Sequence, residues 1–162
     1  MDNRRFRVFY CSKFVYNDNS QQTKTMKNIY HIHTDGGARG NPGPAAVGVV
    51  IHINGILLHQ FGLAIGNTTN NVAEYRGVIE ALKYFRNLTK DTDYELLFIL
   101  DSMLIVNQLN GIFKIKEPHL RELNLQVKIL EQEVGGVIRY TTVPREQNRQ
   151  ADALVNQALD RG

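Results

Sequence analysis

The chain has 162 residues with a formal net charge of +3, and 43% of the residues are hydrophobic and 22% are charged. This length accommodates one domain with a complete hydrophobic core, and the composition is that of an ordinary soluble protein without a secretory signal or an apolar run long enough to span a membrane. The single cysteine, Cys11, excludes an internal disulfide framework and a cysteine zinc cage, so a reducing, cytoplasmic setting is expected.

The basic excess lies in the first 29 residues, whose net charge is +4, whereas the remainder sums to −1. Basic and aromatic residues interleave in RFRVFYCSKFVY, and a polar, turn-like stretch NDNSQQTKT follows. We therefore divide the chain into an N-terminal extension, residues 1–29, and a domain, residues 30–162. Because the domain is nearly neutral, it must hold any polyanion through specific groups or metal ions.

Three antiparallel strands are predicted at the start of the domain. The first leads into Asp35, after which GGARGNPGPA predicts a turn. The next two, AAVGVVIHI and ILLHQFGLAIG, flank Asn54 and Gly55, a pair that strongly indicates a two-residue hairpin.

Helices and strands alternate in the rest of the domain. TTNN caps an amphipathic helix that ends near Asn87, and the apolar run YELLFILD is typical of a buried strand in parallel pairing. SMLIVNQLNG predicts a short helix, residues 117–134 a longer one, GVIRYTTV a fifth strand and RQADALVNQALD a last helix. The order βββαβααβα predicts an α/β fold with a five-stranded mixed sheet, three antiparallel strands and then two parallel ones, flanked by helices.

Four acidic residues are expected to meet at the carboxyl edge of this sheet, where open α/β sheets place their sites: Asp35, Glu74, Asp101 and Asp152. Asp35 and Asp101 end neighbouring parallel strands, and the other two lie near the starts of helices. Clustered carboxylates repel one another unless cations neutralise them, and Mg²⁺ prefers oxygen ligands. The pattern predicts a site for two Mg²⁺ ions, with Mn²⁺ as the alternative, in which one ion activates water and the other stabilises a leaving 3′-oxygen of a phosphodiester.

Each acid also has an ordinary structural interpretation when it is taken alone. Asp35 before two glycines is typical of a turn, Glu74 near a helix start complements the helix dipole, and Asp101 and Asp152 can cap helices. Their joint placement favours the metal site.

The segments around the four acids resemble the motifs of the type 1 ribonuclease H family, in the same order: TDGGARGNPGPAA, TTNNVAEYRGVIEAL, ILDSMLIVNQLNG and NRQADALVNQAL. The resemblance covers about Tyr30 to Asp160. It implies the ribonuclease H fold and endonucleolytic cleavage of the RNA strand of RNA–DNA hybrids, with 3′-hydroxyl and 5′-phosphate products. It also implies that the four acids are the catalytic metal ligands.

The same resemblance matches four further residues to positions that contact the hybrid: Asn41, Thr69, Asn70 and Asn148. Asn71 lies beside this group, and backbone groups of the turn expected at Gly36 are placed to read 2′-hydroxyls. Capping and turn hydrogen bonds are the alternative role for these side chains.

Three features depart from many bacterial relatives. Met103 stands where they carry Gln, and the loop VPREQN lacks their histidine, so Arg145 or Glu146 is a candidate substitute. The short segment 111–118 lacks the extended basic handle. In place of the handle, the candidate nucleic-acid contacts are three arginines of the extension: Arg4, Arg5 and Arg7. The alternative is that the extension is a solvated or partly packed tail.

The expected partner is an RNA–DNA hybrid, with double-stranded RNA as a second possibility, no membrane association and a monomeric state. Two other classes compete with this interpretation. A resolvase, transposase-like or exonuclease domain shares the fold, but the NPGP and TTNN motifs argue against it. A non-catalytic binder of hybrid or duplex RNA has no need of the complete set of acids.

Overall fold

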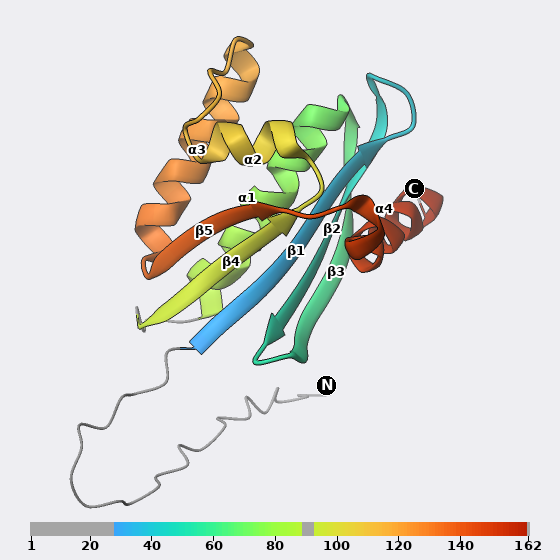
Figure 1. Ribbon diagram of the computed structural model, residues 1–162. Helices are drawn as coiled ribbons and strands as arrows, with labels where there is room; N and C mark the ends of the chain where they lie inside the picture. The colour runs from blue at the N-terminus through green and yellow to red at the C-terminus, as the bar shows by residue number, and fades with distance from the viewer. Residues whose placement is uncertain (1–27, 89–92, 162) are drawn as a thin grey trace, which may run out of the picture.

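Five strands form one mixed sheet in the order β3-β2-β1-β4-β5, with helices on both faces (Figure 1). The computed structural model describes residues 28–88 and 93–161. The elements are β1 (Asn28–Ala38), β2 (Gly43–Ile53), β3 (Ile56–Thr68), α1 (Asn70–Leu88), β4 (Tyr94–Leu100), α2 (Met103–Leu109), α3 (Pro118–Val134), β5 (Val137–Thr142), the 3₁₀ turn η1 (Arg145–Gln147) and α4 (Arg149–Arg161). The predicted element order and mixed sheet are confirmed. Asn28 and Ile29, placed in the extension above, belong to β1, and residues 1–27 lie outside the described part.

The first three strands form a meander and the last two are reached by crossovers. β1 pairs with β2 and β2 with β3 in antiparallel fashion, whereas β1–β4 and β4–β5 are parallel. Asn54 and Gly55, with φ of 51° and 79°, make the predicted two-residue hairpin turn. The pairing of His33 with Ile99 brings the carboxyl ends of β1 and β4 to the same edge.

The turn predicted over GGARGNPGPA is present but shorter than predicted. β1 continues to Ala38, with Gly36 opposite Val47 of β2, and the chain bends only over residues 39–42. Glycines are typical of turns, but Gly36 lies within a strand here. Helix α1 approaches this position too closely for any side chain.

The helices cover the two faces of the sheet unequally. α1 lies on one face with α3 packed over it, and α4 covers the opposite face at β2 and β3 (Figure 1). The main core lies between the sheet and α1, and it includes Ile32, Val49 and Tyr75, all fully buried. The Tyr75 hydroxyl donates to Gln108 Oε1 at 3.0 Å, so the polar end of this buried side chain has a partner within the core. Across the described ranges we find no helix both long and apolar enough to cross a bilayer.

Candidate active site at the carboxyl edge

Three of the four predicted acids meet at the carboxyl edge of the sheet. Asp35 comes from β1, Asp101 directly follows β4, and Glu74 comes from the second turn of α1. One carboxylate oxygen from each lies within 4.8 Å of the others. The convergence follows from the parallel β1–β4 pair and from the approach of α1 to β1.

Gly36 allows α1 to approach the strand this closely. A Cβ at this position would lie 2.2 Å from the Ala73 carbonyl carbon and 2.4 Å from the Glu74 backbone nitrogen. Any side chain would therefore push Glu74 away from Asp35. The Gly36 N–H donates to Asp35 Oδ1 at 2.9 Å, so this amide holds the carboxylate in the structure. A contact between Gly36 and a hybrid stays a prediction.

Two of the clustered carboxyls, those of Asp35 and Glu74, lie in an environment that resists their ionisation. Burial, followed by repulsion from Asp101 and Asp152, raises the pKa of Asp35 to about 6. Burial, Asp35 and Asp101 raise the pKa of Glu74 well above its ordinary value. Glu74 Oε2 is buried and has no hydrogen-bond partner among the described residues. An unpaired buried oxygen beside two other carboxylates suits a divalent cation, because such an ion would neutralise all three.

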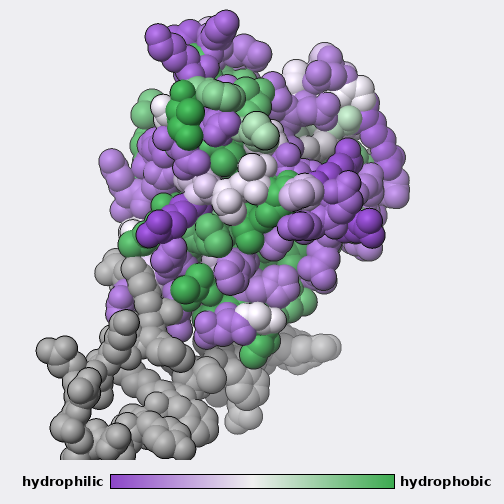
Figure 2. All heavy atoms as spheres, in the orientation of Figure 1, coloured by the Kyte–Doolittle hydropathy of each residue, from purple (hydrophilic) through white to green (hydrophobic). Residues whose placement is uncertain are grey.

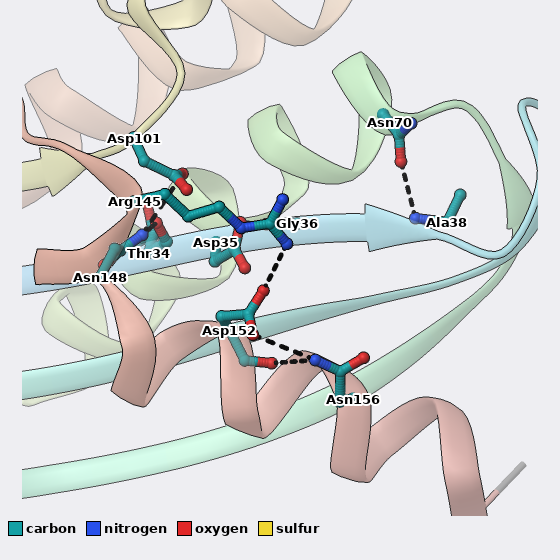
Figure 3. A network of polar contacts seen from close by, with 10 residues as sticks. All are labelled: Thr34, Asp35, Gly36, Ala38, Asn70, Asp101, Arg145, Asn148, Asp152 and Asn156. Atoms are coloured by element: carbon teal, nitrogen blue, oxygen red, sulfur yellow. Dashed lines mark hydrogen bonds and ion pairs between the residues drawn. The ribbon is translucent and has the colours of Figure 1, made fainter.

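Asp152 lies on the wall of the same pocket but outside the triad. The pocket, about 590 Å³, is lined by the three clustered acids as well as by Asp152, Arg145 and Asn156. Asp152 Oδ1 accepts from Arg145 Nη2 at 2.8 Å, and Asp152 Oδ2 accepts from Asn156 Nδ2 at 3.2 Å (Figure 3). The sequence placed all four acids in one cluster, and the structure brings three together with the fourth facing them across the pocket.

Asn148 lies inside the protein and joins three elements. Its side chain is 1% exposed, and its Nδ2 donates to the Thr34 carbonyl at 2.9 Å and to Asp101 Oδ1 at 3.5 Å. Its Oδ1 lies 3.2 Å from His33 Nδ1. The amide thus fastens the segment before α4 to β1 and to the acid after β4. The predicted hybrid contact of Asn148 stays a prediction, because these partners occupy its amide in the structure.

The other predicted contact residues lie at the rim, where β1 meets α1. Asn70 Oδ1 accepts from the Ala38 N–H at 2.8 Å (Figure 3), and the Asn70 N–H donates to Asn41 Oδ1 at 3.1 Å. Thr69 Oγ1 accepts from the Val72 N–H at 3.4 Å, which is a helix cap. Asn71 is half-buried in the first turn. The arginines of the extension, Arg4, Arg5 and Arg7, lie outside the described residues.

Two residues at the site were missed from the sequence. Asn156 stands four positions after Asp152 on one helix, a spacing that places the two on the same face and could have revealed it. His33 precedes Asp35 by two positions on β1, and burial is the main cause that lowers its pKa.

Comparisons with known proteins agree with this arrangement. A family model described as Reverse transcriptase-like matches residues 33–158. Ribonuclease HI of Halobacterium salinarum is 41% identical over 133 residues, which cover 80% of this chain and 64% of that protein. LC11-RNase H1, isolated from compost by a metagenomic approach and solved in complex with an RNA/DNA hybrid, is 44% identical with a TM-score of 0.78, and the match covers 83% of this chain and 98% of that one.

This chain belongs to the type 1 ribonuclease H family. Among its relatives in this ribonuclease H family, a bifunctional protein of Mycobacterium tuberculosis is 42% identical over 131 residues, which cover 80% of this chain but 35% of that protein. The chain therefore spans less than two thirds of the length of these two curated relatives.

Proposed function

We propose that this chain is an endoribonuclease that hydrolyses the RNA strand of RNA–DNA hybrids by a two-metal-ion mechanism. The observation that carries the proposal is the triad of Asp35, Glu74 and Asp101, with a buried, unpaired Glu74 oxygen and a solvent-facing pocket in front of it. Membership of the ribonuclease H family, one of whose members was solved with an RNA/DNA hybrid, supports the same substrate.

The donor set fits hard divalent cations. Asp35, Glu74 and Asp101 would hold them, with Asp152 as a further carboxylate across the pocket, and Mg²⁺ is the first choice with Mn²⁺ as the alternative. When bound, such ions supply charge neutralisation and Lewis-acid polarisation at a phosphodiester. Arg145 is the cation that balances Asp152 in the structure, and its exposed guanidinium can turn towards a phosphate instead.

The proposed reaction is the hydrolysis of a phosphodiester bond. A water oxygen forms a bond to phosphorus, its proton passes to solvent, and the bond from phosphorus to the 3′-oxygen breaks. The leaving oxygen takes a proton, so the products carry a 3′-hydroxyl and a 5′-phosphate. The carboxylates orient this attack because three elements fix their positions.

Selection of a hybrid requires recognition of an RNA strand and a DNA strand together. The rim formed by Asn41, Thr69 and Asn70 lies beside the pocket and offers side-chain and backbone amides suited to phosphate and sugar contacts. The 2′-hydroxyl both donates and accepts, so Asn70 and the Gly36 backbone are the groups we assign to it. Duplex RNA presents the same hydroxyls on both strands and is the second substrate to test.

A cleavage assay with end-labelled RNA–DNA hybrid, duplex RNA and duplex DNA tests this function. We expect cleavage of the hybrid's RNA strand with Mg²⁺ or Mn²⁺, no cleavage in EDTA and intact duplex DNA. Ligation of the products to an oligonucleotide with a 3′-hydroxyl reports their 5′-phosphates. Hybrid binding without cleavage under every metal condition would instead support the non-catalytic binder.

Removal of one carboxylate from the triad should abolish cleavage and preserve hybrid binding. We expect Asp35→Asn and Asp101→Asn each to lower kcat by at least about a thousandfold, the scale of losing a major electrostatic contribution. Asp160→Asn, an exposed change at the far end of α4, is the matched control and should cleave normally. Turnover retained in both triad variants would contradict the assigned metal roles.

A further inference from the structure

Three histidines lie on the same face of the sheet as α4, in a part of that face that α4 does not cover. His31 and His33 alternate along β1 and therefore point to the same side, and His52 of β2 stands directly opposite His31. The His33 and His52 ring centroids are 6.3 Å apart with the ring planes at 82°. All three side chains are half-buried, so each ring retains access to solvent.

The rings border apolar side chains on a stretch of the sheet that no described helix covers. No described helix stands in front of the uncovered stretch of β1, β4 and β5 (Figure 1). Figure 2, in the same orientation, shows hydrophilic and hydrophobic side chains mixed over this side of the molecule. Leu97 lies beside His31 on β4 and Ile99 beside His33, so the histidines are bordered by apolar side chains on that strand.

The hydrogen bonds of Asn148 fix which nitrogen of His33 carries the proton. Asn148 Nδ2 donates to the Thr34 carbonyl, so the atom that faces His33 Nδ1 at 3.2 Å is the carbonyl oxygen Oδ1. That oxygen can only accept a hydrogen bond, so Nδ1 must carry a proton to donate to it. The neutral ring therefore presents the lone pair of Nε2, and its orientation is held by an amide oxygen. This is the outer-shell arrangement typical of a histidine that binds a metal ion.

We propose that His31, His33 and His52 form a second metal site, for a first-row transition ion that favours imidazole, with Zn²⁺ as the reference ion. Two ligands two residues apart on one strand and a third on the adjacent strand give a three-histidine set, and water completes a tetrahedral shell. In the described part of the chain only the three carboxylates already bring their ligand atoms within 4.8 Å of one another. The histidines therefore close on the ion by turning about their side-chain torsions, with His33 as the fixed member.

This site differs in chemistry from the carboxylate cluster. Nitrogen ligands select Zn²⁺, Ni²⁺, Co²⁺ or Cu²⁺, whereas Mg²⁺ requires oxygen ligands and competes poorly for imidazole. Excess Mg²⁺ therefore separates the two sites experimentally, because it fills the carboxylate cluster and leaves the histidines available.

The test is a Co²⁺ titration of the 162-residue chain, without a tag, in excess Mg²⁺. Visible absorption follows the titration, and displacement by Zn²⁺ is the second step. We expect one equivalent of Co²⁺ to give the intense d–d bands of a tetrahedral site, and Zn²⁺ to abolish them. Because loss of an outer-shell partner alone costs about 10–100-fold in affinity, His31→Gln, His33→Gln and His52→Gln should each weaken binding by at least about tenfold. His119→Gln, at an exposed histidine of α3, and Cys11→Ser are the controls and should bind as the unmodified chain does.

Several outcomes would overturn the proposal. These are absence of a one-to-one complex in excess Mg²⁺, unchanged affinity in the three strand variants, or a loss shared by His119→Gln or Cys11→Ser. Circular dichroism checks that each variant is folded. If His33→Gln does not fold, His31→Gln and His52→Gln decide the question.

Discussion

At the scale of single residues, the site stores unfavourable electrostatic energy until a cation binds. Asp35 is 8% exposed, and its neighbours Asp101 and Asp152 carry the same charge. One backbone N–H donates to it, and that bond does not outweigh burial and repulsion. Ionised Asp35 therefore lowers the free energy of unfolding of the metal-free protein. A bound cation would relieve this repulsion, and the relief would strengthen metal binding.

This cost predicts a pH-dependent gain in stability for Asp35→Asn. The folded pKa of about 6 lies above the unfolded value of 3.8. The folded state therefore binds more protons between these pH values, and the free energy of unfolding falls as pH rises through that window. In EDTA at pH near 7.5 the variant should be more stable than the unmodified chain by up to about 3 kcal/mol, and near pH 4 the difference should vanish.

Urea denaturation at the two pH values measures this difference. Addition of Mg²⁺ at the higher pH should stabilise the unmodified chain and leave Asp35→Asn unchanged or nearly so. Equal stability of the two proteins in EDTA at the higher pH would show that Asp35 is not destabilising when ionised.

At the scale of elements, the side-chain amide of Asn148 links the segment before α4 to the sheet. Asn148→Ala would leave the buried Thr34 carbonyl without its donor and His33 without its acceptor. We expect a loss of about 1–3 kcal/mol in the free energy of unfolding, because a buried polar group then lacks a partner. Asn156→Ala, at an exposed asparagine of the same helix, is the control and should cost about 0.5 kcal/mol or less.

Kinetics separates this role from a hybrid contact of Asn148. A residue that only grips the hybrid would raise KM and leave urea stability unchanged when it is replaced. Replacement of a residue that holds η1 and α4 against the sheet should lower both stability and kcat, because the positions of Asp101 and Asp152 depend on that segment.

The contact between β1 and α1 gives a second prediction at this scale. Gly36→Ala would place a methyl group 2.2 Å from the α1 backbone, so the helix must move and take Glu74 with it. We expect a loss of about 3 kcal/mol and much weaker metal binding. Gly37→Ala is the matched control, because its methyl meets only Val155 Cγ1 at 3.2 Å, and should cost about 1 kcal/mol or less. Equal unfolding midpoints in urea for the two variants would refute the close-approach account.

Elements and their order were predictable from local patterns, and contacts between distant side chains were not. Asn54-Gly55 predicted the hairpin, and the apolar run before Asp101 predicted a central parallel strand, so the meeting of Asp35 with Asp101 followed from topology. The end of β1 was mispredicted because Gly36 makes room for α1 and does not form a local turn. The burial of Asn148 depends on partners more than 100 positions away, which no local pattern encodes.

At the scale of the whole molecule, charge is divided between the extension and the folded domain. Residues 1–27, which precede β1, carry a net charge of +4 and the remainder −1. A hybrid is a polyanion that approaches a pocket walled by acids, so the domain alone offers little long-range attraction. Arg4, Arg5 and Arg7 of the extension would supply that attraction without altering the chemistry of the site.

The salt dependence of hybrid binding tests this division of labour. Each phosphate neutralised by a cation adds about 0.7–0.9 to the slope of log affinity against log salt concentration. The 162-residue chain with Arg4, Arg5 and Arg7 replaced by Gln should therefore bind hybrid with a slope shallower by about 2–3. Deletion of residues 1–27, which also removes three lysines, should lower the slope at least as much. Single-turnover cleavage at saturating enzyme should be unchanged, because the carboxylates remain in place.

Arg86→Gln, at the far end of α1 from Glu74, is the control for loss of a positive charge as such. If the slope of the unmodified chain persists in both arm variants, the arm is a tail without a role in binding, and the rim around Asn70 must hold the hybrid by itself.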